Sequence, residues 1–155
     1  MEQQKLEITA FELEELKIDR NASYEVSDSF GPVNVSVDFE VFTNRDDATQ
    51  FAVGLIVKTC CSDEPDVRCP LKILARIAGY FVVSEPLAEG KVPVPIAVNG
   101  LTILYGIARG HLATATGWFG VPVVFPTVYF SERVRAKLQP MPEVNEIETT
   151  AATAD

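Results

Sequence analysis

Cysteine, histidine and carboxylate side chains are the groups in this 155-residue chain that could support chemistry at a site. Cys60, Cys61 and Cys69 form no C-x-x-C pair, and the single histidine, His111, is distant in sequence. A zinc site needs four well-spaced ligands, or three and a water. We therefore expect no metal site, and we expect the three thiols to be reduced and structural.

Catalytic patterns are also missing from the sequence. His111 lacks the serine or cysteine context of a nucleophile elbow. Glu14 and Glu15 are neighbours in an expected strand, so outside a bulge they point to opposite faces and cannot work as an acid–base pair. Neither GxGxxG nor GxxxxGK[ST] occurs. We expect no catalytic residue, no cofactor and no nucleotide, and hence a protein that is not an enzyme.

Charge narrows the class of partner. The net charge is −9, which argues against nucleic acid. Residues 2–66 carry 15 acidic and 5 basic residues, residues 67–137 carry 3 and 8, and residues 138–155 carry 4 and none. This distribution suits a protein partner with a basic patch, or serves solubility alone. No secretory signal and no uncharged apolar stretch of membrane-spanning length are visible, so we expect a cytoplasmic protein without membrane insertion.

The first half of the chain predicts four strands. Alternation of apolar and polar residues is clearest over residues 33–41, and the same two-residue period recurs in 51–57 and 71–83. A first strand over about residues 8–19 changes phase at Glu14–Glu15, which predicts a β-bulge. The short connections, rich in Gly, Pro, Asn and Asp, favour an antiparallel meander.

A crossover and a long helix are expected next. Residues 85–94 are apolar and rich in proline, which predicts an extended connection rather than a strand. The long helix is expected from about Leu101 to Thr116, with Asn99 as N-cap. Its apolar stripe consists of Leu104, Ala108, Leu112 and Ala115.

A short helix and a tail complete the predicted α+β chain. Ser131 is expected to cap a helix that runs to Leu138. Residues 139–155 show no periodicity and few large apolar groups, which predicts a flexible acidic tail. We therefore expect a single domain over residues 1–138, with a four-stranded antiparallel sheet, a crossover loop, a long helix and a short C-terminal helix.

Two features of the second half suggest contacts between chains. Gly106, Gly110 and Thr114 place small residues four apart on the long helix, and each helical glycine costs ~1 kcal/mol relative to alanine. Close approach of another helix, from a second subunit or from the same chain, accounts for such a stripe. The proline-rich apolar segments 82–98 and 118–130 either form a groove for a partner or cover the core of their own chain.

The order of these elements resembles SecB, the bacterial export chaperone, over about residues 8–138. The resemblance is carried by residues 11–19, Ser23–Glu25, the AGYF motif at Ala78–Phe81, the helix-opening segment Ile103–Arg109, and Pro126–Phe130. It implies a SecB-like homotetramer, a dimer of dimers packed across the long helices, with Gly106, Gly110 and Thr114 at the interface.

The resemblance also implies an activity, which is ATP-independent holding of unfolded polypeptide and its delivery to the SecA export motor. Asp19, Glu25 and Leu74 are the positions that match the family's docking face for SecA. The implied peptide-binding groove is lined by Val37, Phe39, Phe81, Leu87, Val94, Leu101, Tyr105, Phe125 and Tyr129.

Several positions depart from the family pattern. Gly106 replaces a usual proline, Tyr129 replaces a usual asparagine, and Leu74 replaces an acidic docking residue, with Lys72 and Arg76 nearby. The last helix, SERVRAKL, also differs strongly. Because some SecB-like chaperones guard the antitoxin of a toxin–antitoxin pair, an antitoxin or another specific client is the alternative to SecA.

A second alternative is a hot-dog-like acyl-binding enzyme, because that fold also packs a long helix against an antiparallel sheet. Its helix follows the first strand, however, whereas four strands precede the helix here. The order of elements therefore argues against it.

Overall fold

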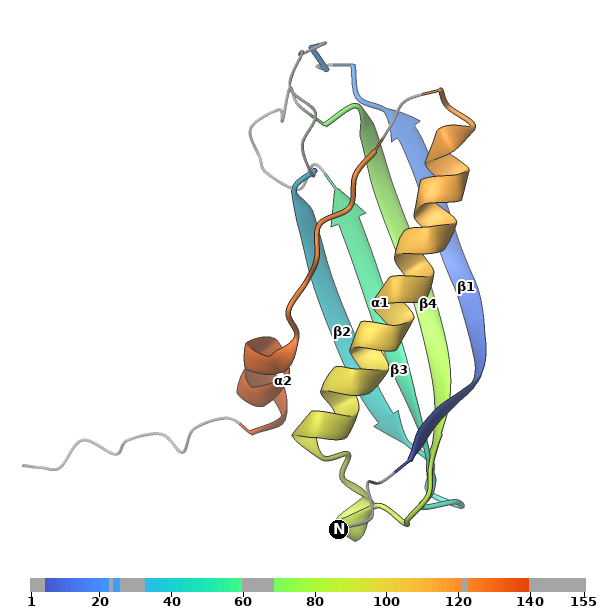
Figure 1. Ribbon diagram of the computed structural model, residues 1–155, viewed down its shortest axis with the longest axis vertical. Coiled ribbons are helices and arrows are strands. Elements are labelled where there is room, and N and C mark those ends of the chain that lie inside the picture. Colours follow the sequence, from blue (N-terminus) through green and yellow to red (C-terminus); the bar gives the residue numbers. More distant parts are fainter. Residues whose placement is uncertain (1–4, 23, 26–32, 60–68, 121–122, 140–155) are drawn as a thin grey trace, which may run out of the picture.

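Four antiparallel strands and a long helix form the body of the molecule (Figure 1). The computed structural model describes residues 5–22, 24–25, 33–59, 69–120 and 123–139. The elements in chain order are β1 (Leu6–Arg20), β2 (Val35–Thr43), β3 (Gln50–Thr59), β4 (Leu71–Val83), the 3-10 turn η1 (Ala88–Gly90), α1 (Val94–Gly117) and α2 (Ser131–Leu138). The expected α+β architecture is confirmed.

The alternation in the sequence sets which face of the sheet is buried. In β3, Val53, Leu55 and Val57 are almost fully buried, while the residues between them are only partly covered. Leu55 pairs with Phe39 on β2 and with Ile77 on β4, so apolar side chains from three strands share one face. Such a row of apolar residues is what a helix needs in order to pack across a sheet.

Strand β1 does not continue the meander. The sheet order is β1-β4-β3-β2, so only β2, β3 and β4 form a meander, and β1 and β2 are the two edges. The bulge expected at Glu14 is confirmed as a register shift between Leu13 and Glu15, and a second shift lies between Ile8 and Ala10. Each shift changes which side chains of β1 point to the helix side.

Helix α1 begins earlier than expected. Pro93 is its N-cap and Pro95 lies in its first turn, so residues 94–100 are helical and Asn99 is not a cap. Proline is tolerated there because the first turn of a helix needs no backbone N–H donors. The proline-rich composition that predicted a crossover up to residue 94 and beyond therefore marks a helix start.

The inner face of α1 packs on the middle of the sheet. Leu104, Ala108 and Leu112 are buried as expected, but Ala115 is only half-buried and Thr116 is buried instead. The Thr116 hydroxyl donates to the Leu112 carbonyl at 2.8 Å, which satisfies it inside the core.

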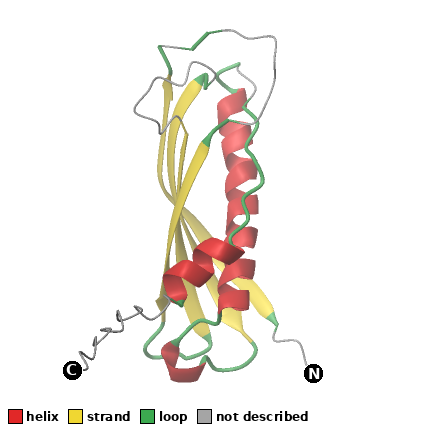
Figure 2. Ribbon diagram, turned by 90° about the vertical axis from the view of Figure 1, so that its left-hand side faces the viewer, coloured by secondary structure: helices red, strands yellow, loops and turns green. Residues whose placement is uncertain are grey.

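Both helices and residues 123–130 cover the same face of the sheet, which leaves its other face uncovered by the described residues (Figure 2). The segment 123–130 runs extended beside β2 and leads into α2, whose bounds are as expected (Figure 1). Phe130, rather than Ser131, is the N-cap of α2, and its side chain makes no capping bond.

Near the start of β4, Cys69 is disulfide-bonded. The expectation of reduced thiols is therefore wrong at this position. Asn21, after β1, donates from its side-chain amide to the Cys69 carbonyl at 2.8 Å, which ties the two chain segments together. The predicted tail, except for Gln139, lies outside the described residues.

Candidate functional site

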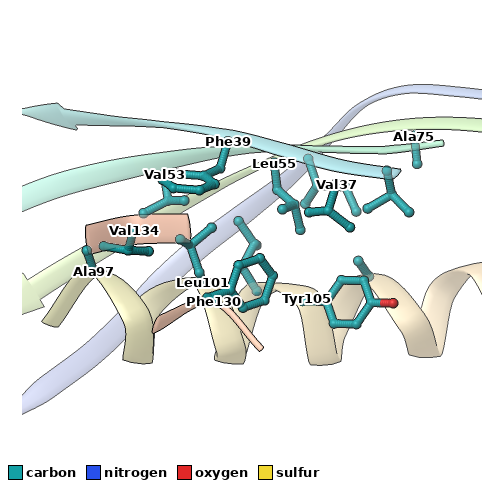
Figure 3. Packing of buried hydrophobic residues seen from close by; sticks show 14 of the residues in the cluster. Val37, Phe39, Val53, Leu55, Ala75, Ala97, Leu101, Tyr105, Phe130 and Val134 are labelled. Atoms are coloured by element: carbon teal, nitrogen blue, oxygen red, sulfur yellow. The ribbon is translucent and has the colours of Figure 1, made fainter. Parts of the chain in front are cut away.

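The first candidate site is the part of the apolar core between β2 and α1, which we call the channel and which the chain itself fills (Figure 3). Phe130 enters from the end of segment 123–130 and makes edge contacts with Phe39 of β2 and Tyr105 of α1, at centroid distances of 6.5 and 5.9 Å. Val134 of α2 is fully buried beside them. The channel therefore takes apolar side chains from a segment far along the sequence.

Two hydrogen bonds fix segment 123–130 in this channel. The Tyr105 hydroxyl donates to the Pro126 carbonyl at 2.8 Å, and burial raises the pKa of Tyr105. The backbone N–H of Val33, just before β2, donates to the Val124 carbonyl at 2.9 Å. One contact comes from the helix side and one from the sheet side, so the extended segment is held between the two layers.

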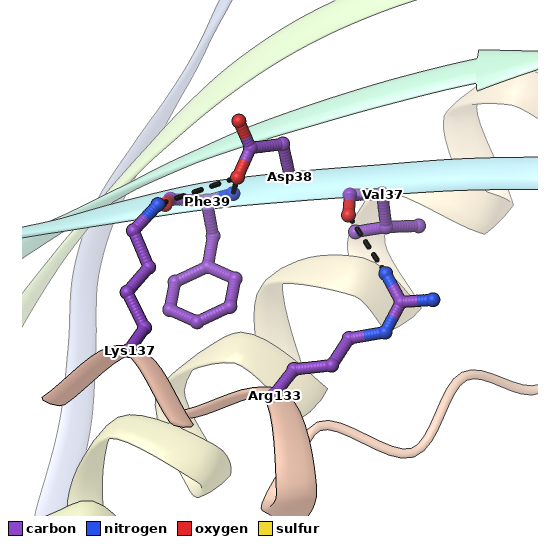
Figure 4. Close-up of polar contacts among 5 residues, drawn as sticks. All are labelled: Val37, Asp38, Phe39, Arg133 and Lys137. Atoms are coloured by element: carbon purple, nitrogen blue, oxygen red, sulfur yellow. Dashed lines mark hydrogen bonds and ion pairs between the residues drawn. The ribbon is translucent and has the colours of Figure 1, made fainter. Parts of the chain in front are cut away.

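Helix α2 is attached to the edge of β2 by two cations (Figure 4). Arg133 donates to the Val37 carbonyl at 2.8 Å. Lys137 donates to the Phe39 carbonyl, approaches the Asp38 carboxylate at 3.3 Å, and lies 4.9 Å from the centre of the Phe39 ring. Two hydrogen bonds lower the pKa of Asp38. The bond from the Phe39 backbone N–H is the larger cause, and the bond from Lys137 is the second.

Most residues predicted to line the groove are buried within this chain. Val37, Phe39, Phe81, Leu87, Leu101, Tyr105 and Phe125 are all buried, Val94 is half-buried, and Tyr129 is 82% exposed. Val37, Phe39, Tyr105 and Phe130 lie together, whereas Phe81 stacks on Phe51 at 5.2 Å under another part of α1. Segment 123–130 and α2 would have to withdraw before a client could reach the buried members, so the groove remains a prediction.

The residues predicted for an interface between subunits lie on the open side of α1. Gly106, Gly110 and Thr114 are exposed, and a Cβ added at either glycine would meet nothing within 4 Å. Beside Thr114 is a hollow of about 600 Å³ that is also lined by Leu13, Leu16, Ile18, His111, Ala115, Trp118 and Phe119. Trp118 is 88% exposed, so this side of the molecule is more apolar than the glycine stripe alone indicated.

The residues predicted for SecA docking lie in and just beyond one end of the sheet, in a region of mixed charge. Asp19 lies opposite Lys72 on the neighbouring strand, and Leu74 lies between Lys17 of β1 and Lys58 of β3. Glu25 is exposed beyond the end of β1.

Glu15, another carboxylate of β1, is already engaged. Glu15 pairs with Lys17 at 2.8 Å and with Arg76 at 2.9 Å. The hydrogen bond from Lys17 is the largest cause of the lowered pKa of Glu15. The Glu15 side chain is thus occupied by cations of its own sheet.

Sequence reasoning missed Arg133, Lys137 and the apolar face of β1. Arg133 and Lys137 are four residues apart, so the helical period already placed two cations on one face of the last helix. For β1, the second bulge at Thr9 gave no visible signal. Within the described parts of the chain no group of three or more potential metal ligands occurs, and no helix has the length and apolarity to cross a membrane.

The four-stranded antiparallel sheet, the long helix across one face and the short helix at its edge define a SecB-like fold. One similar solved structure is the SecB-like chaperone Rv1957 of Mycobacterium tuberculosis, in complex with a ChAD peptide from the Rv1956 HigA1 antitoxin. It has a TM-score of 0.53 and 14% identity over 79% of this chain and 86% of that one.

Another similar structure is a protein of unknown function from Streptococcus agalactiae, with a TM-score of 0.52 and 12% identity over 82% of this chain and 100% of that one. No family model and no curated protein matches the sequence. At this identity the likeness shows the fold.

Proposed function

We propose that this protein is an ATP-independent holdase chaperone that binds unfolded polypeptide in the channel between β2 and α1. The observation that carries the proposal is that segment 123–130 already lies there in an extended conformation. Phe130 contacts both Phe39 and Tyr105. The Pro126 carbonyl accepts a hydrogen bond from the helix side, and the Val124 carbonyl accepts one from the sheet side. The channel therefore suits an extended, apolar chain. A similar fold in complex with an antitoxin peptide supports the same conclusion.

Affinity in this proposal comes from several apolar contacts at once. A buried Leu or Phe side chain contributes ~1.5–3 kcal/mol. Association itself costs ~4–15 kcal/mol, so one short peptide binds weakly. A long chain that engages several subsites binds much more tightly through effective concentration. The proposed lining is drawn from the nine residues named above. Tyr129 is accessible before any rearrangement, whereas Phe81 stacks on Phe51 outside the channel.

Self-association multiplies these subsites. We propose a dimer of dimers that covers the open side of α1 with Gly106, Gly110 and Thr114, together with the adjoining hollow around Trp118. Apolar surface of this kind is rarely left open in a monomer, and closed symmetry favours an even number of copies.

The proposal extends to the partner that receives or supplies the client. Delivery to SecA requires an acidic docking face, but Leu74 lies between Lys17 and Lys58, and Glu15 is already paired. A dedicated client, such as an antitoxin, needs no such face. We therefore favour a cytoplasmic chaperone of a specific client over general delivery to SecA.

Light scattering tests the holding activity directly. An aggregating client, such as reduced insulin, should scatter less in the presence of the protein and without ATP. Tyr129→Ala should weaken the protection, whereas Thr127→Ala, an exposed neighbour outside the proposed lining, should not. Equal aggregation with and without the protein would contradict the proposed holding activity.

Calorimetry with the isolated SecA C-terminal module decides between the partners. Binding by the parent should be weak and salt-sensitive or absent, and Leu74→Glu should strengthen it. Tight binding by the parent that survives physiological salt, with no gain from Leu74→Glu, would show that SecA is the partner after all.

A further inference from the structure

The outer edge of β2, which pairs with no strand among the described residues, presents main-chain groups at alternate residues. In an antiparallel strand the N–H and C=O of one residue point to the same side, and successive residues alternate sides. The carbonyls of Val37 and Phe39 accept bonds from α2, so the odd-numbered residues of β2 face away from β3. The even-numbered residues, such as Ser36 and Glu40, face β3.

Polar side chains occupy this edge in the place of a neighbouring strand. Arg133 and Lys137 donate to the Val37 and Phe39 carbonyls, as the N–H groups of a neighbouring strand would. The Asp38 carboxylate accepts from the Phe39 N–H at 2.8 Å, as a neighbouring carbonyl would. Figure 4 shows the three side chains gathered on this one edge.

The chain also uses this edge for true backbone pairing. Val33 lies in the same odd-numbered series, and its N–H donates to the Val124 carbonyl of the extended segment 123–130. The edge therefore already accepts one extended backbone, while further along it carries side-chain substitutes in place of a strand. Exposed strand edges are templates for pairing with other chains, and natural proteins cover them.

We infer that the edge of β2 from Val35 to Val41 is a strand-addition site for the backbone of an extended client segment. The client takes over the positions that Arg133, Lys137 and Asp38 now hold. This inference rests on the proposed holdase function and names how that function recognises its substrate. Main-chain hydrogen bonds are the same for every sequence, so they give affinity for an extended segment, and the side chains of that segment then decide which client fits.

The side chains of the added segment follow from the register. Successive side chains of a strand point to opposite faces of the sheet. Every second client residue would thus point to the inner face, towards Phe39 and Tyr105, and the others would point to solvent. A segment with alternating apolar residues is the class of ligand that fits.

Residue-resolved amide exchange by NMR tests this geometry. The probe is reduced, carboxymethylated α-lactalbumin, which is permanently unfolded, and co-elution by gel filtration establishes binding. The outward amides of Val35 and Val41 should exchange at least tenfold more slowly in the complex, whereas those of Ser36 and Glu40, which face β3, should change less than twofold. If the client binds and the two sets respond alike, or neither responds, the inference is wrong and the holdase proposal stands. If the client does not bind, both are wrong.

Two pairs of variants test the same edge through affinity for the same probe. Replacing both Arg133 and Lys137 by glutamine should raise affinity about tenfold, because the client no longer displaces charged hydrogen bonds. Arg135→Gln makes the same type of change on the same helix, at a side chain without a bond to β2 among the described residues, and should leave affinity unchanged. Equal effects at the two places would contradict the inference.

Val41→Pro removes one outward N–H and is compatible with an edge strand. It should lower affinity about fivefold relative to Val41→Ala, which changes the side chain only. Equal affinity of the two variants would overturn strand addition. If Val41→Pro does not fold, the exchange pattern of the unaltered protein decides.

Discussion

Asp38 joins strand and helix at a single side chain. Its carboxylate accepts from the Phe39 N–H and lies 3.3 Å from Lys137, and both interactions favour the ionised form. The side chain is largely solvent-exposed, so the stabilisation is modest. What matters is its location, because it connects the edge of the sheet to the element that covers the edge.

The attachment of α2 should therefore weaken at acidic pH. The folded-state pKa of Asp38 is below its ordinary value of 3.8, so its contribution is present above that value and is lost as pH falls through the folded pKa. Methyl NMR signals of Val134, which is buried under α2, should report loosening of the helix below about pH 4. Asp38→Asn should remove this acid transition. An unchanged pH profile in the variant would assign the transition to another group.

Tyr105 supports segment 123–130 through one hydroxyl group. Tyr105→Phe should destabilise the fold by about 0.5–1.5 kcal/mol, because the Pro126 carbonyl loses a donor inside the channel. Urea unfolding measures the change. Tyr129→Phe makes the same chemical change at a ring that is 82% exposed and should have no measurable effect. Equal effects in the two variants would argue against the Pro126 bond.

At the scale of elements, one glycine sets how closely α1 approaches the sheet. A Cβ at Gly79 of β4 would come within 2.9 Å of the Phe81 ring and 3.0 Å of a Leu104 methyl. Gly79 is the glycine of the AGYF motif, so the motif has a packing reason in this molecule. The helix can lie on the sheet there only because no side chain stands between them.

Gly79→Ala should therefore cost about 1–3 kcal/mol by overpacking the core. Gly54→Ala on the adjacent strand is the control, because its added Cβ meets only the Phe42 ring at an ordinary 3.8 Å. Thermal unfolding of the two variants measures the difference. A small effect of Gly79→Ala would mean that α1 can shift outwards without loss.

The sequence predicted the elements well where one physical rule dominated. Alternation in residues 51–57 and 71–83 identified β3 and β4, and the phase change at Glu14 identified a bulge, because burial of one face leaves a clear period. It failed at α1, where Pro93 and Pro95 suggested an extended chain although proline is also favoured at helix starts.

The candidate site was less predictable for a different reason. Whether Phe39 lines an open groove or a core depends on what covers it, and its cover, Phe130 and α2, comes from about ninety residues later in the chain. Local patterns contain no record of that contact. The cation pair Arg133 and Lys137 was visible as a spacing, but its acceptors are carbonyls, which every residue has.

The molecule as a whole has two apolar regions with different exposure. The channel beside β2 is filled by the chain itself, whereas the hollow beside Thr114 is open, with Trp118 at its margin. The proposed assembly would cover the second region and leave the first for clients. Binding and association would then use separate surfaces, so each can be altered without the other.

Trp118 is the only tryptophan and reports directly on the proposed assembly. Its emission should shift to longer wavelength on dilution, as subunits separate and the ring becomes exposed to water. Light scattering should give a tetramer mass at micromolar concentration, and Gly106→Leu should shift it towards a dimer. Ala136→Leu, an exposed helical position on α2, should not change the mass. A monomer mass for the parent would contradict the assembly.

The pairing of β1 with β4 also governs the order in which the chain can fold. Arg20 pairs with Leu71 and Leu6 pairs with Val83, so β1, which is made before β4, has no partner until β4 has emerged from the ribosome. The hairpins β2–β3 and β3–β4 close short loops and can form first, whereas β1 must wait for a distant contact, which slows folding. During synthesis, β1 therefore has unpaired main-chain groups as well as its exposed side chains Phe11, Leu13 and Leu16, and the nascent protein passes through the kind of unfolded state that we propose it binds in other chains.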